Sequence, residues 1–291
     1  MALFVRRQAV LTRGGDPSRA LMDVRLFSVA SFRNGNIATL IIGLGEFGIV
    51  AVLPLWLQFT LGYSALQAGL ALVPVAIGSF VASGASFPMS TKVAPLGQVR
   101  FGLAMEVVGL AGLGLIAATD SPWWSIALVL FAYGIGVGFA TAQVTNVVLA
   151  EVPGHSAGQG SGIQSAFRQL GSALGIAVLT TAFFTTLGSR LRAGLGGLGD
   201  AGLSAAEPGR YAHAVTDSAG AAIGPLAAHP ATAPVADAAR SAMTTGITVG
   251  GLIAAGFVVL GLIATALIPG TPAGASAAPD PSPAEPEPAR P

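Results

Sequence analysis

The stretch NIATLIIGLGEFGIVAVLPLWLQ, residues 36–58, decides the fold. It is predominantly apolar and carries a single ionisable side chain, Glu46. The hydrocarbon core of a bilayer takes about 20 largely apolar residues in a helix, whereas a membrane strand alternates in segments of about ten. Residues 36–58 are therefore predicted to form a membrane-spanning helix.

Five further stretches pass the same test. They are residues 65–86, 99–118, 123–150, 160–187 and 244–268. The composition agrees, because 53% of the residues are hydrophobic and only 9% are charged, whereas soluble domains carry about a quarter charged residues. We predict an all-α integral membrane protein, a bundle of six transmembrane helices that occupies residues 36–268.

The segments outside the spans differ in composition. Residues 1–35 hold six arginines and no cleavable apolar core, so we expect a cytoplasmic N-terminal linker and membrane insertion through the internal segments. Residues 188–243 are rich in Gly, Ala and Pro and are predicted to form a long extracytoplasmic loop. The Pro/Ala-rich residues 269–291 are typical of a disordered tail, here cytoplasmic.

The orientation follows from the basic residues near the spans. The loop 87–100 holds Lys92 and Arg100, whereas the loops 59–64 and 119–122 hold no Lys or Arg. Cytoplasmic flanks carry an excess of these residues. We therefore expect a multi-pass protein of the plasma (or bacterial inner) membrane with both termini in the cytoplasm.

Several function classes are excluded by the composition. The net charge of +1 does not favour nucleic acid as a partner, and the chain has no cysteine and only three scattered histidines. Residues 154–158, GHSAG, match the G-x-S-x-G motif of esterases, but that motif works on a strand-to-helix turn, and here it lies between two membrane helices. We therefore expect that the chain is not an enzyme and that it has no catalytic residues, no cofactor and no metal site.

Glu46 lies near the middle of the first predicted span. A central acidic residue costs roughly 2.5–3.5 kcal/mol on insertion scales, so a compensating role is expected. One interpretation is a proton-coupling residue that faces a water-filled cavity, since burial disfavours the charged form of a carboxyl group. The alternative is a permanently protonated carboxyl that bonds to neighbouring backbone.

Two more charges lie inside spans at similar predicted depth. Glu106 is about two turns into the third span, and Arg168 is about two turns into the fifth. They could form an ion pair, or each could extend toward the inner headgroups. Both are expected to have structural roles.

Four polar side chains form two pairs on helix faces. Gln143 and Asn146 lie three residues apart on the fourth span, and Gln164 and Arg168 lie four apart on the fifth. Together they could form a polar patch at the inner mouth of a pathway. The alternative is ordinary hydrogen bonding between helices.

Glycines crowd two of the spans. Gly134, Gly136 and Gly138 lie on the fourth span, and Gly171 and Gly175 form a small-xxx-small pair on the fifth. Small residues allow helices to approach closely in a membrane. We expect close helix contacts at both places.

Several motifs resemble those of a known family, and they occur in the same order as in that family. They are LMDVRLF (21–27) with Ser31-Phe32, LPLWLQ (53–58), LGYSALQAG (61–69), GQGSG (158–162) and RQLG (168–171). Over about residues 14–268 the chain resembles the last six helices of the fourteen-helix drug:proton antiporters of the major facilitator superfamily. The resemblance implies a half of that transporter fold, with Glu46 on a helix that lines the central cavity.

The loop 90–100 is similar to the basic gating loop of the superfamily. It keeps Lys92, Gly97 and Arg100 but lacks the usual acidic residue. The resemblance also implies some eight preceding helices, which this sequence does not contain. We expect the six-helix half to pair with a second half or with another copy of itself.

Two hypotheses for function remain. The first is a transporter component that exports amphipathic organic compounds, such as drugs, in exchange for protons. The second is a membrane protein that does not transport, either a truncated remnant or a partner that modulates another subunit. The lipid bilayer, protons and a small organic substrate are the partners implied by the first hypothesis.

Overall fold

The computed structural model describes residues 24–196 and 207–268. Within these ranges every regular element is a helix, and six helical segments are long and apolar enough to cross a membrane, which confirms the predicted fold class. The elements are η2 (Val24–Ser28), α2 (Ala30–Glu46), α3 (Gly48–Phe59), α4 (Ala65–Leu70), α5 (Val73–Met89), α6 (Pro95–Ile116), α7 (Trp123–Leu149), η3 (Gly154–Ser156), α8 (Ala157–Gly196), α9 (Glu207–Asp217), α10 (Ile223–Ala227), α11 (Ala233–Ala264) and η5 (Thr265–Leu267).

Two of the six spans are interrupted helices. The first span consists of α2 and α3, which meet at Phe47, and the second consists of α4 and α5. The second span begins with a capping box: the Ser64 hydroxyl accepts a bond from the Gln67 amide, and the Gln67 side chain accepts one from the Ser64 amide. Pro74 stands in the first turn of α5, where its missing N–H costs no helical bond.

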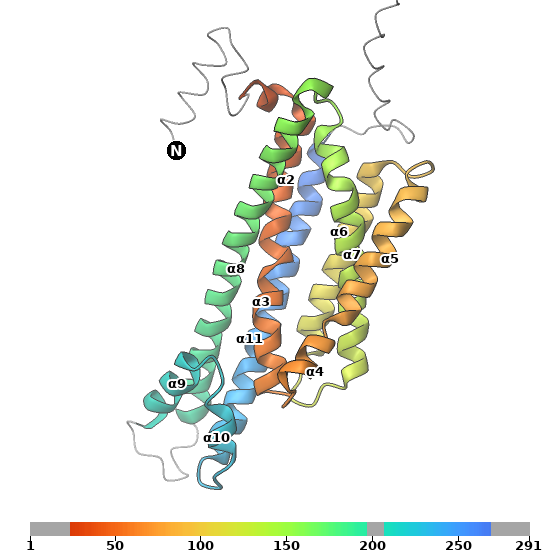
Figure 1. Cartoon of the computed structure of the whole chain (residues 1–291). Helices are drawn as coiled ribbons and strands as arrows, with labels where there is room; N and C mark the ends of the chain where they lie inside the picture. The colour runs from red at the N-terminus through yellow and green to blue at the C-terminus, as the bar shows by residue number, and fades with distance from the viewer. Residues whose placement is uncertain (1–23, 197–206, 269–291) are drawn as a thin grey trace, which may run out of the picture.

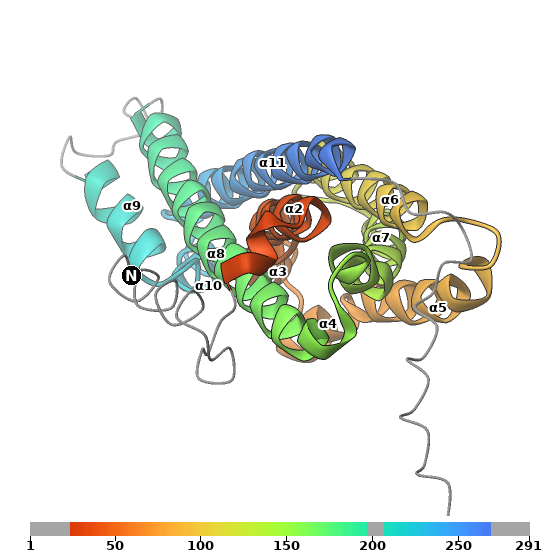
Figure 2. The same cartoon turned by 90° about the horizontal axis from the view of Figure 1, so that it is seen from above.

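The spans form one bundle with distinct ends (Figure 1). The start of α2 and the connection from α7 to α8 lie at one end, and α9 and α10 lie at the other. Seen along the bundle, α5, α6 and α7 lie together on one side, while α8 lies on the other (Figure 2). The last span, α11, packs against α2, α6 and α8 and so joins the two sides.

Glycines permit the closest helix contacts, as the sequence predicts. A Cβ atom at Gly171 would overlap the carbonyl oxygen of Leu40, and one at Gly175 would overlap that of Leu44. A Cβ at Gly138 would lie 2.5 Å from the carbonyl oxygen of Ser79. The α2–α8 and α5–α7 contacts are therefore backbone to backbone, which strengthens packing where lipid offers no hydrophobic drive.

The segment 188–243 differs from the predicted loop, because most of its described part is helical. The helix α8 continues to Gly196, α11 already begins at Ala233, and α9 and α10 lie between them. Ala212 and Val215 of α9 and Ile223 of α10 are fully or almost fully buried. The alanine-rich composition that suggested a loop also suits helices, and these helices bury small apolar side chains against α8 and α11.

Some predictions fall outside the described residues. These are most of the predicted N-terminal linker, residues 1–23, the segment 197–206 of the predicted loop, and the predicted disordered tail, residues 269–291.

Candidate functional site

Glu46 is the last residue of α2 and lies inside the bundle. Its side chain is almost fully buried, with 5% relative exposure of the residue. The Oε1 atom of its carboxylate lies 3.2 Å from an Nη atom of Arg168, a hydrogen-bonded ion pair between α2 and α8. The sequence offers Glu46 no basic neighbour on its own helix, so its partner comes from a distant span.

This ion pair replaces the one suggested by the sequence. Arg168 was expected either to pair with Glu106 or to reach the headgroups, and instead it binds Glu46. The same guanidinium donates to the Thr141 hydroxyl at 3.4 Å, and its central carbon lies 5.7 Å from the centre of the Phe47 ring. A carboxylate, a hydroxyl and an aromatic face thus hold the cation from α2, α7 and the helix break.

Tyr133 of α7 completes the contacts around the helix break. Its hydroxyl donates a hydrogen bond to the backbone carbonyl oxygen of Glu46. The backbone of Tyr133 lies against Gly109 of α6, where an added Cβ would lie 2.5 Å from the Tyr133 Cβ and 2.6 Å from its Cα. Sequence reasoning missed Tyr133, because an aromatic residue in a span is ordinary. The glycine opposite it on α6 is the one sequence signal that marks the close approach.

Glu106 lies deeper than Glu46 and lacks a direct partner. The residue is fully buried on α6, and neither carboxylate oxygen has a hydrogen-bond partner among the described residues. It interacts electrostatically with both Glu46 and Arg168, so the three ionisable groups form one cluster. We call Glu46, Glu106, Arg168 and Tyr133 the central cluster.

A small cavity adjoins the central cluster. It offers about 20 Å³ of space for water, roughly enough for one molecule. Its lining comes from α2, α7 and α8 and consists of Thr39, Ile42, Glu46, Ala140, Thr141, Val144 and Arg168. The carboxylate, the guanidinium and two threonines supply the polar partners that a bound water needs.

Two other predicted polar residues, Gln143 and Asn146, belong to a hydrogen-bond network that does not include Arg168. Asn146 donates to Gln143 at 3.1 Å, Gln143 donates to the Ser86 hydroxyl at 2.7 Å, and Ser86 donates to Gln98 at 2.7 Å. Gln164 is buried on α8. It takes no part in this series of hydrogen bonds among the described residues. Among the described residues no hydrogen bond joins Gln143 or Asn146 to Gln164 or Arg168, and the hydrogen-bond network of Gln143 connects α5, α6 and α7.

The predicted gating-loop residues lie at the end of the bundle where α6 begins. Arg100 donates to the hydroxyl and the carbonyl oxygen of Thr265, at 3.1 and 3.0 Å, and so caps the end of the last span. Lys92 is exposed. Gly97 lies in the first turn of α6, and a Cβ atom added there would lie 3.3 Å from the Val93 side chain. Of the three, Arg100 is the one with a bond to another span.

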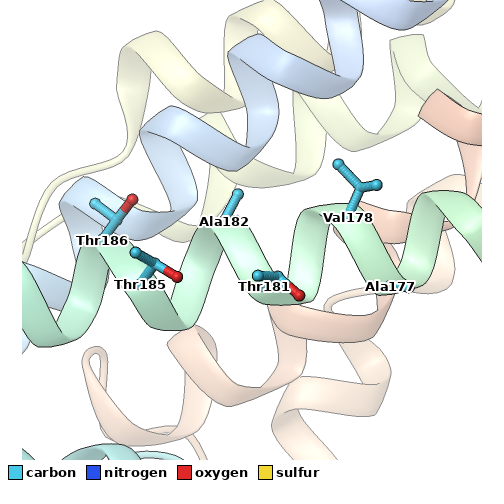
Figure 3. A pocket seen from close by; sticks show the side chains of 6 residues that line it. All are labelled: Ala177, Val178, Thr181, Ala182, Thr185 and Thr186. Atoms are coloured by element: carbon cyan, nitrogen blue, oxygen red, sulfur yellow. The ribbon is translucent and has the colours of Figure 1, made fainter.

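A shallow hollow lies on the surface of α8. It is lined by Ala177, Val178, Thr181, Ala182, Thr185 and Thr186 (Figure 3). All six residues come from a single helix, so no second element converges on a ligand there. The central cluster, built from four helices, is the candidate functional site.

The described residues thus form a bundle of six candidate membrane spans with an ion pair in its interior. The sequence model of the family described as Major Facilitator Superfamily matches residues 3–176, more than half of the chain. The chain therefore belongs to the major facilitator superfamily, as its motifs predict. Since this is a family of transporters, the expectation that the chain is not an enzyme is confirmed.

Similar proteins bear names that point to drug resistance and export. A tetracycline resistance determinant of Streptomyces rimosus is 31% identical over 58% of this chain and 50% of its own length. The multidrug efflux pump LfrA of Mycolicibacterium smegmatis is 29% identical over 84% of this chain and 46% of its own length. A probable actinorhodin transporter of Streptomyces coelicolor is 28% identical over 62% and 31%. The chain thus spans half or less of these relatives.

Proposed function

We propose that the chain supplies the C-terminal six-helix half of an exporter that moves drugs or other amphipathic organic compounds out of the cell by proton antiport. The names of the relatives support the export of such compounds. The observation that carries the proposal is the Glu46–Arg168 ion pair, which lies at a helix break and lines a small cavity inside the bundle. In this proposal Glu46 is the residue that takes up and releases the proton.

Proton uptake at Glu46 would act directly on the contact between α2 and α8. A proton removes the negative charge on which the ion pair depends. The attraction between the two helices at this level then falls, and the α2–α8 contact can rearrange. Because the first span is interrupted at Phe47, next to the carboxylate, the change in charge occurs where the span bends most easily.

The substrate pathway is proposed to need a second six-helix unit. Transporters of this superfamily bind substrate near the bilayer midplane, between two six-helix halves. We propose that the cavity-lining side of α2, α7 and α8 faces that second unit, which is another half or a second copy of this chain. The basic residues near the spans support a plasma-membrane orientation with both termini in the cytoplasm.

The test is Glu46→Gln in everted membrane vesicles from a host without its own drug pumps. The chain is produced alone and together with the N-terminal half of the LfrA relative, and ethidium uptake is driven by an imposed proton gradient. We expect uptake with the unaltered chain, loss of uptake with Glu46→Gln, and a partial rate with Glu46→Asp. Asp237→Asn, which removes a carboxylate from the exposed Asp237–Arg240 pair, is the matched control. Unchanged uptake by Glu46→Gln would refute proton coupling through this residue.

A further inference from the structure

The proposed function leaves Glu106 without a role, although this carboxyl group is fully buried. A carboxylate that is fully buried without a hydrogen-bond donor costs several kcal/mol, and the structure gives neither oxygen of Glu106 a donor among the described residues. The single guanidinium of the cluster is already bound to Glu46. Glu106 therefore holds a proton in this arrangement, and the cluster contains one cation, one anion and one neutral carboxyl.

The helix α7, which packs against Glu106, also contacts both members of the ion pair, Glu46 through Tyr133 and Arg168 through Thr141. A Cβ atom at Gly136 of α7 would lie 2.6 Å from the Glu106 Cγ, so this glycine leaves room for the side chain. Tyr133, one turn earlier on α7, reaches across to the carbonyl oxygen of Glu46. Electrostatic interactions link Glu106 to Glu46 and to Arg168, while residues 241–264 of the packed α11 contain no ionisable side chain. Among the described residues, Glu46, Arg168 and the Tyr133 phenol are thus the ionisable groups that interact electrostatically with it.

We propose that Glu106 is a second proton-binding carboxyl, which takes Arg168 as its partner when Glu46 takes up a proton. This inference deepens the proposed function and rests on proton exchange at Glu46. The proton that Glu46 gains is the one that Glu106 gives up, and the Glu106 carboxylate then receives the guanidinium. The two carboxyls hold one proton between them in both states, and the cluster stays electrically neutral inside the membrane. The long, flexible arginine side chain moves between the two carboxyls.

Infrared spectroscopy of the purified chain gives the sharpest test. At neutral pH the unaltered chain should show the carbonyl stretch of a protonated carboxylic acid, and Glu106→Gln should remove it. Glu46→Gln should remove it as well, although Glu106 is still present, because Glu106 then becomes the anionic partner of Arg168. Asp237→Asn should keep the band. If Glu46→Gln retains the band, Glu106 does not exchange partners and the proposal is wrong.

Thermal unfolding provides a second, independent readout. Either single change, Glu46→Gln or Glu106→Gln, leaves Arg168 one carboxylate, so each should lower the unfolding midpoint only slightly. The double variant leaves a partly buried cation without an anion and should lose several degrees more than the sum of the single losses. Adding Arg168→Gln should restore most of that difference. Additive losses, or the full loss with Glu46→Gln alone, would contradict the proposal.

These measurements do not depend on transport. A band lost in both single variants, together with ethidium uptake unaffected by Glu46→Gln, would support partner exchange and refute the proposed coupling. A band that persists in Glu46→Gln, together with lost uptake, would refute partner exchange and leave the coupling by Glu46 intact.

Discussion

Glu46 and Arg168 are 122 positions apart in the chain, yet their side chains form the ion pair of the bundle interior. Breaking a buried ion pair by removing one partner costs roughly 3–5 kcal/mol. The relative solvent exposure of the Arg168 side chain is 31%, whereas that of the Glu46 side chain is only 6%. Water therefore stabilises part of the arginine charge. The carboxylate therefore depends on the pair more than the guanidinium does.

Arg168→Ala is expected to lower the thermal unfolding midpoint and the folded yield in detergent. It leaves the Glu46 carboxylate buried without its cation, at a cost of about 1–3 kcal/mol after allowance for the partial exposure of the pair. The loss should shrink as the pH is lowered, because protonation of Glu46 removes the unpaired charge. Midpoints measured across a pH series check this, with Arg240→Ala on the exposed ion pair as the control. A loss that grows toward acidic pH would contradict this account.

The sequence identified the three charged residues of the central cluster but left open which of them pair. A charge inside an apolar stretch is conspicuous in any sequence, so Glu46, Glu106 and Arg168 all stood out. Pairing depends on how each helix is rotated about its axis, and six spans with weak one-sided patterns leave that rotation open. Tyr133 was missed for a related reason, since its function arises only from the carbonyl oxygen opposite it.

At the scale of the helices, the spans were predicted well and their ends less well. The first span begins at Ala30 rather than near residue 36, because the Glu151 carboxylate accepts a bond from the Ser31 amide at 3.3 Å and so stabilises the helix start. The fifth span runs past the predicted end at residue 187 to Gly196. Hydropathy predicts which residues lie within the lipid. The ends of these helices are set instead by local hydrogen bonds and by packing against other helices.

The α2–α8 contact can be tested with two glycines of one helix. Gly171→Ala places a methyl group against the Leu40 carbonyl oxygen and should lower the unfolding midpoint, since two helix backbones must move apart. Gly162→Ala is the matched control, because nothing lies within 4 Å of its added Cβ. It should be neutral or slightly stabilising, by up to about 1 kcal/mol from helix propensity. Equal effects of the two changes would show that the contact is looser than described.

At the scale of the whole molecule, the orientation is a prediction that cysteine labelling can check. The chain has no native cysteine, so single replacements report one place each. Ser28 and Asp217 are exposed residues. Ser28 ends η2, just before α2, and Asp217 ends α9, and the start of α2 and α9 lie at opposite ends of the bundle (Figure 1). In intact cells a membrane-impermeant thiol reagent should label Asp217→Cys and not Ser28→Cys. The reverse pattern would place the termini outside the cell.

The unbroken length of α8 has a mechanical consequence. The helix has 40 residues, so it is about 60 Å long and about twice as long as the hydrocarbon core is thick. Arg168 lies in its first third, and α9 packs against the helix beyond the predicted span. A rotation of the helix about the Glu46–Arg168 pair therefore has a short arm, residues 157–167, and a long arm, residues 169–196. A tilt of about 10° at the arginine displaces the far end, some 40 Å away, by about 7 Å. The length of α8 beyond Arg168 therefore converts a small rearrangement at a single ion pair into a displacement of several ångströms at the far end of the helix, where α9 packs against it.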